Sequence, residues 1–75
     1  MCGIIGINSN RPVSSTIISS LKKLEYRGYD SAGIATLSNN KINEVKSEGR
    51  VDKLENNSLV QNMVGTIGIG HVRWA

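Results

Sequence analysis

The sequence predicts a small α+β fold built on antiparallel strands, and three observations lead to this class. Short apolar or alternating runs bounded by turn residues occupy residues 2–8, 34–46 and 66–73, as expected of strands and a hairpin. One amphipathic helical pattern, at residues 13–24, separates the first two runs. A helix combined with a hairpin and further strands is typical of α+β domains.

The first predicted strand, residues 2–8, is apolar on both faces and is therefore expected to lie buried between layers. It begins with Cys2, the only cysteine of the chain, directly after Met1. Removal of Met1 would give a terminal cysteine that combines a thiol nucleophile with an α-amino group, whose reference pKa of about 7.7–8.0 allows it to act as a base near neutrality. A single cysteine in a strand is more often a small buried hydrophobe, so this chemistry needs further support.

A helix is predicted to begin near Pro12, which lacks the N–H that a first helical turn leaves unused. Lys22 and Lys23 suit the negative end of the helix dipole, and Gly28 is placed to end the helix. The apolar residues that share one helical face are Val13, Ile17, Ile18, Leu21 and Leu24.

Residues 26–33 are polar and interrupted by glycine, and we expect them to form an ordered loop. The next apolar run, residues 34–38, is predicted to be a strand. Asn39 and Asn40 supply a two-residue hairpin turn that accepts positive φ, and residues 41–46 return antiparallel.

The second arm of this hairpin has a weakly specified register because Ile42 and Val45 fall on opposite faces. A short helix is predicted around residues 51–55. A second apolar cluster follows, and the sequence does not settle its secondary structure; it consists of Leu59, Val60, Met63 and Val64.

The last predicted strand, residues 66–73, contains Gly68 and Gly70, which invite the close approach of another backbone. The same glycines match two positions of a dinucleotide-binding loop, but Arg73 stands at the third and no helix-length sequence follows. We therefore exclude that loop. In an extended chain Arg73 and Trp74 point to opposite sides, so that one can reach a cleft while the other packs.

The size and composition indicate part of a larger fold. A chain of 75 residues, 39% of them apolar, is near the lower limit for one hydrophobic core. One cysteine cannot form an internal disulfide, and no Cys/His cluster has zinc-binding spacing. No residue pattern implies a metal or an organic cofactor, and the lone thiol fits a reducing cytoplasm.

The formal charge of +3 does not indicate nucleic-acid binding, because the basic residues are scattered among glutamates such as Glu25 in the pattern of a solvated surface. Three aromatic residues offer little for base stacking. No segment approaches the roughly 20 apolar residues that a membrane span needs. Residues 1–24 lack acidic side chains, as transit peptides do, but they open on a strand pattern instead of a basic amphipathic helix.

Three blocks of sequence stand out together: MCGIIGI at residues 1–7, LEYRGYDSAGIA at residues 24–35 and GIGHVRWA at residues 68–75. The chain resembles the class II glutamine amidotransferases, which are N-terminal-nucleophile hydrolases, and most closely the subfamily of glutamine:fructose-6-phosphate amidotransferases. Phosphoribosyl-pyrophosphate amidotransferases usually carry His and Gln where this chain has Tyr26 and Tyr29.

The resemblance implies a four-layer αββα fold with antiparallel sheets, of which residues 1–75 would be the amino-terminal part, without the isomerase domains. It implies that Cys2 attacks the carboxamide of L-glutamine, releases ammonia and forms a γ-glutamyl thioester that water hydrolyses. The parent protein would be a cytoplasmic homo-oligomer that passes ammonia to fructose 6-phosphate in domains that this chain lacks. No nucleic acid or membrane would be involved.

The resemblance also assigns supporting residues. Arg73 corresponds to the residue that grips the α-carboxylate of glutamine, a task suited to a bidentate guanidinium. Trp74 corresponds to a residue that helps to gate the ammonia channel. Arg27 and Gly28 lie in the loop flanking the nucleophile, although a helix cap and a surface arginine explain them equally well. His71 is expected to be a strand residue and not a base, because a terminal amine leaves it no task.

The family's oxyanion hole and the acidic residue that holds the α-amino group of glutamine lie beyond the matched blocks. Losing one oxyanion donor costs roughly 100- to 1,000-fold in rate, so we expect the 75 residues alone to be nearly inactive. Two alternatives stay open: a non-catalytic assembly or regulatory piece that pairs through its open strands, and the glutaminase part of another class II amidotransferase.

Overall fold

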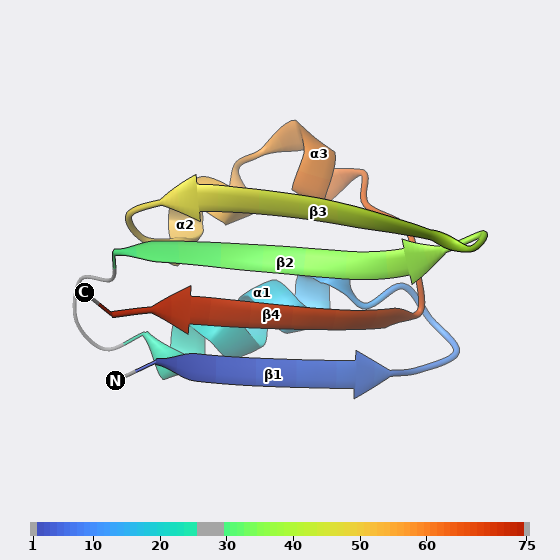
Figure 1. Cartoon of the computed structure of the whole chain (residues 1–75), viewed down its shortest axis with the longest axis horizontal. Helices are drawn as coiled ribbons and strands as arrows, with labels where there is room; N and C mark the ends of the chain where they lie inside the picture. Colours follow the sequence, from blue (N-terminus) through green and yellow to red (C-terminus); the bar gives the residue numbers. More distant parts are fainter. Residues whose placement is uncertain (1, 26–29, 75) are drawn as a thin grey trace.

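A four-stranded antiparallel sheet organises the chain in the computed structural model, which describes residues 2–25 and 30–74 (Figure 1). The strand order is β1-β4-β2-β3, so the first and last strands lie side by side. The bounds are Gly3–Asn8 for β1, Ser31–Ser38 for β2, Lys41–Glu48 for β3 and Ile67–Arg73 for β4. The predicted α+β class is confirmed.

Three helices pack on one face of this sheet and give the molecule two layers (Figure 1). They are α1, Ser14–Leu24, α2, Val51–Glu55, and α3, Ser58–Gln61. Helix α1 begins at Ser14 instead of Pro12 and ends at Leu24 with Glu25 as its cap, so the prediction that Gly28 ends it is wrong. The unsettled apolar cluster contains α3, where Val60 is buried. No helix within the described ranges has the length and apolar character needed to cross a membrane.

The hydrophobic core lies between α1 and the sheet. Ile17 and Leu21 of α1 are fully buried and sit over Gly68 and Gly70 of β4. The two glycines therefore mainly make room for side chains of α1. The predicted close approach of another backbone is seen at Gly68, which lies near the Ala35 carbonyl. This contact fixes the distance between the two layers.

The hairpin between β2 and β3 has the predicted turn, with Asn39 at φ 52° and Asn40 at φ 62°. Strand β2, however, begins at Ser31, within the stretch that was expected to be a loop. It pairs with β3 on one side and β4 on the other, and the hydrogen bonds of both ladders outweigh the weak strand propensity of its small residues. The register is set by the core, since Val45 is buried and Ile42 is exposed.

The other face of the sheet, which we call the open face, is covered by no element of the described chain. Ile4 is 78% exposed and Ile42 is 75% exposed, and Ile69 between them is also exposed. The prediction that the first strand is buried on both faces is therefore wrong for this chain. The described residues form one sheet layer and one helix layer, whereas the resemblance implies four layers for the complete fold.

Thr36 provides a test of the polar contacts within the core. Its side chain is 2% exposed, and its hydroxyl donates a 2.8 Å hydrogen bond to the carbonyl of Val64. We expect Thr36→Val, which keeps the shape, to lower the free energy of unfolding by about 1–3 kcal/mol because the carbonyl loses its partner. Urea denaturation of the chain measures this difference, and an unchanged midpoint would contradict it.

Candidate active site

Cys2 lies exposed at the start of β1. Strand β1 runs antiparallel to β4, with Gly3 opposite Val72, so Cys2 and Arg73 come to the same end of the two paired strands. Alternation along the chain from Ile4 puts Cys2 on the open face, which Arg73 also occupies. The two predicted site residues, distant in sequence, are thus brought together by the pairing of the first and last strands.

Arg73 is held by its backbone while its side chain stays accessible. Its carbonyl accepts a 2.9 Å hydrogen bond from the N–H of Asp30, just before β2 begins. Its guanidinium Nη1 lies 3.9 Å from Oδ2 of Asp30, and the side chain is 68% exposed. Asp30 thus contacts Arg73 through both its backbone and its carboxylate. The guanidinium lies beside one carboxylate and stays accessible to a ligand.

Trp74 follows Arg73 at the same end of the sheet and is 38% exposed. His71, two residues before Arg73, lies on the open face, where its ring covers Gly33 so closely that a Cβ there would overlap it. This placement agrees with the expectation that His71 is a strand residue. Met1, Arg27 and Gly28 lie outside the described residues, so their predicted roles stay predictions.

Glu25 is a feature that sequence reasoning missed. It was counted among the solvated surface charges, yet its side chain is only 5% exposed. Its carboxylate accepts a 2.9 Å hydrogen bond from the N–H of Val51 and lies 3.1 Å from Nη2 of Arg50. Both contacts are with residues far along the chain, so no local pattern could have indicated them.

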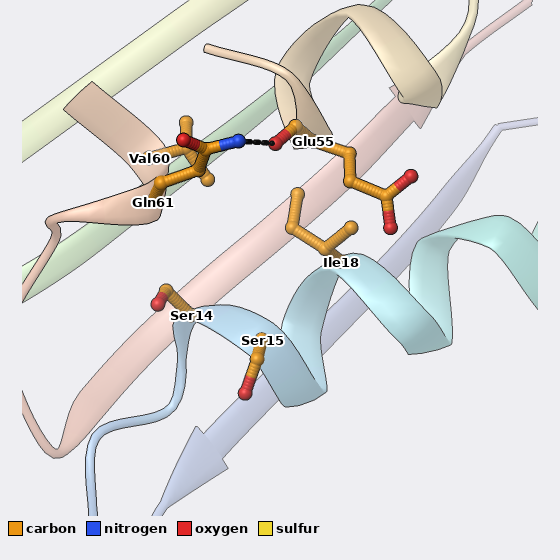
Figure 2. A pocket seen from close by; sticks show the side chains of 6 residues that line it. All are labelled: Ser14, Ser15, Ile18, Glu55, Val60 and Gln61. Atoms are coloured by element: carbon orange, nitrogen blue, oxygen red, sulfur yellow. Dashed lines mark hydrogen bonds between the residues drawn. The ribbon is translucent and has the colours of Figure 1, made fainter. Parts of the chain in front are cut away.

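A hollow on the helical side of the molecule holds none of the predicted site residues (Figure 2). It lies between α1 and the short helices α2 and α3, and on the wall opposite α1 Gln61 donates a 3.2 Å hydrogen bond to the carbonyl of Glu55. The described residues also contain no cluster of three or more His, Cys, Asp or Glu side chains that could hold a metal. The predicted site residues that the structure describes include an exposed thiol, that of Cys2, and an exposed guanidinium, that of Arg73.

An accessible guanidinium next to a nucleophile suits a substrate that carries a carboxylate near its reacting group. Adjacent strands lie about 4.7–4.9 Å apart, so groups at the ends of β1 and β4 can contact both ends of one small amino acid. This spacing favours a small amino acid, such as glutamine, as a ligand at this end of the sheet.

Comparison with known proteins shows which proteins the chain is similar to. Proteins named glutamine–fructose-6-phosphate aminotransferase (isomerizing) align with the whole chain at 49% identity in Rhizobium meliloti and 52% in Brucella abortus and Clostridium acetobutylicum. The chain spans 12% of the length of each relative. No protein-family profile matches it.

Among solved structures, the allosteric regulatory enzyme of purine biosynthesis superposes on the chain with a TM-score of 0.87 at 27% identity. The superposition includes all of this chain and 16% of that enzyme. The resemblance inferred from three blocks of sequence thus extends from end to end. Over its full length, the chain is a homologue of one segment of the glutamine–fructose-6-phosphate aminotransferases.

Proposed function

We propose that this chain is the nucleophile-bearing part of a glutaminase that supplies ammonia to fructose 6-phosphate. The observation that carries the proposal is the pairing of β1 with β4, which brings Cys2 and Arg73 to the same end of the sheet. Identity of about half of all residues to the glutamine–fructose-6-phosphate aminotransferases supports the choice of substrate.

In the proposed reaction Met1 has been removed, and the α-amino group of Cys2 accepts the thiol proton. The sulfur attacks the carboxamide carbon of L-glutamine and forms a tetrahedral intermediate. The protonated amine then gives its proton to the leaving nitrogen, and ammonia departs from a γ-glutamyl thioester. Water attacks the thioester with the amine again acting as base, which releases glutamate and regenerates the thiol.

Arg73 would bind the α-carboxylate of glutamine throughout this sequence. The guanidinium lies 3.9 Å from the Asp30 carboxylate, a contact that leaves N–H donors of the fork for a bidentate pair with the substrate. Lysine offers a point charge without the planar fork, so it would hold the carboxylate less rigidly. Trp74 would gate the passage of ammonia, and Arg27 and Gly28 would help to position Cys2.

We further propose that the parent protein acts in the cytoplasm as a homo-oligomer that forms glucosamine 6-phosphate. The lone thiol supports a reducing compartment. Fructose 6-phosphate would bind in sequence that corresponds to the remaining length of the relatives. The open face, with its exposed isoleucines, would be covered in the longer protein.

The proposal is tested by trapping Cys2 with a diazo-ketone analogue of glutamine and measuring the intact mass of the protein. We expect a mass that lacks Met1 and gains a single adduct, with labelling slowed by excess L-glutamine. A Cys2→Ala variant, which has no thiol, is the matched control and should stay unlabelled. Because the oxyanion hole of the family lies beyond the matched blocks, the same measurement is also made on a chimera, in which the chain replaces the matching 75 residues of the Clostridium acetobutylicum relative.

A chimera that retains Met1 or an unreactive thiol would contradict the nucleophile assignment. The exposed apolar open face favours one second candidate, a non-catalytic piece that assembles with another chain. That candidate predicts stable association with the remainder of the relative's domain but no release of glutamate. Measuring glutamate release from the mixture separates the two candidates.

A further inference from the structure

Two ion pairs join the end of α1 to the region of α2, and they differ in burial. Lys22 and Glu55 are 2.6 Å apart and both are half-exposed, so the pair contributes little to stability. Glu25 and Arg50 are 3.1 Å apart, and the Glu25 side chain is almost completely buried. Burying a charged carboxylate costs free energy unless the group is paired and hydrogen-bonded. The partners of Glu25 are therefore expected to be held in place more firmly than those of Glu55.

Among the described residues, the groups that satisfy Glu25 belong to the corner between β3 and α2, formed by Gly49, Arg50 and Val51. One carboxylate oxygen faces Arg50, and the other accepts the backbone N–H of Val51, the first residue of α2. Gly49 has φ +89°, a conformation that favours glycine. Glu25 therefore fixes both a side chain and the backbone of this corner.

The same corner also binds Asp30, which in turn contacts Arg73. The N–H of Gly49 donates a 2.8 Å hydrogen bond to the carbonyl of Asp30, and the N–H of Asp30 donates one of 2.9 Å to the carbonyl of Arg73. The Asp30 carboxylate also faces the Arg73 guanidinium. A continuous set of contacts thus runs from Glu25 through the corner to Asp30 and Arg73.

We propose that Glu25 and Arg50 are positioning residues for the glutamine site, acting through the corner on Asp30 and Arg73. This inference rests on the proposed function, and it adds residues that touch neither the nucleophile nor the substrate. Arg73 would contact glutamine in the ground state and the transition state alike. Misplacing it therefore weakens binding of both states and raises KM while leaving kcat nearly unchanged.

Glutaminase kinetics of the chimera test the inference. We expect Glu25→Gln and Arg50→Ala to raise KM for glutamine about tenfold or more, because small displacements of a positioning group cost up to about 100-fold. Both variants should keep kcat within about threefold. Arg50→Lys, which retains the charge facing Glu25, should recover most of the affinity. Glu55→Gln, which breaks the exposed pair instead, is the matched control and should behave as the parent.

Amide hydrogen exchange on the 75-residue chain gives a second readout that needs no activity. We expect Glu25→Gln to speed exchange at the N–H groups of Gly49 and Asp30 about tenfold, with amides in the centre of β4 unchanged. The Glu55→Gln control should leave both rates unaltered.

The two readouts separate the inference from the proposed function. An unmutated chimera without glutaminase activity would overturn the proposed function. Hydrogen exchange would then still test whether Glu25 holds the N–H groups of Gly49 and Asp30 in place. If the chimera is active but Glu25→Gln and Arg50→Ala leave KM unchanged, the positioning role is wrong. A rise in KM of equal size in Glu55→Gln would also overturn it, because the effect would then reflect general destabilisation.

Discussion

Replacing Cys2 with alanine is expected to lower the glutaminase rate constant of the chimera by at least about 10⁴-fold, or about 5.4 kcal/mol of barrier. The nucleophile of a covalent mechanism has no substitute at the site, and removal of such a group in a serine protease costs roughly 10⁶-fold. The described residues offer no second thiol, and the ring of His71 packs against Gly33. Release of glutamate, followed at saturating glutamine, measures the loss.

The binding of glutamine serves as the control for this substitution. In the proposed reaction Arg73 would bind the substrate through its side chain, so Cys2→Ala should retain the dissociation constant of the parent within about threefold, measured by calorimetry. Cys2→Ser, which keeps a weaker nucleophile, should fall between the parent and the alanine variant in rate. A Cys2→Ala protein that keeps a tenth or more of the parental rate would rule out a thioester at this residue.

The elements that could be predicted are those whose signal is local. The spacing of Ile17, Ile18 and Leu21 gives the buried face of α1, and the Asn39–Asn40 pair gives the hairpin turn. In both places the physical cause, a helical period or tolerance of positive φ, lies within a few residues. The position of Cys2 directly after Met1 made it a candidate nucleophile, but only the resemblance to the amidotransferases assigned it that role.

The features that could not be predicted depend on partners far along the chain. Strand β2 starts at Ser31 because it has a neighbour on each side, which its own glycine and alanine do not indicate. Glu25 is buried because Arg50 and Val51 meet it, although its sequence context is that of an exposed charge. The adjacency of Cys2 and Arg73 likewise follows from the strand order, which only the resemblance could suggest.

The contact between Ile17 and Gly70 is expected to carry the second large effect. A Cβ on Gly70 would lie 2.5 Å from Cγ2 of Ile17, so Gly70→Ala should lower the free energy of unfolding by about 1–3 kcal/mol through overpacking. Gly6 is the matched control, since it also lies within a strand but a Cβ there meets Ile69 at an ordinary 3.8 Å. Gly6→Ala should be neutral or stabilise by about 0.4–1 kcal/mol.

A double-mutant cycle then identifies the cause. Ile17→Ala alone opens a cavity under the sheet and should cost about 2–5 kcal/mol, because the side chain is fully buried. In the double variant Cγ2 of Ile17 is absent, so the new methyl group at residue 70 meets no overlapping atom of residue 17 and occupies part of the cavity. The combined loss should therefore be smaller than the sum of the two single losses by at least about 1 kcal/mol. Additive losses in urea denaturation, or equal midpoints for Gly70→Ala and Gly6→Ala, would show that the helix does not rest on Gly70.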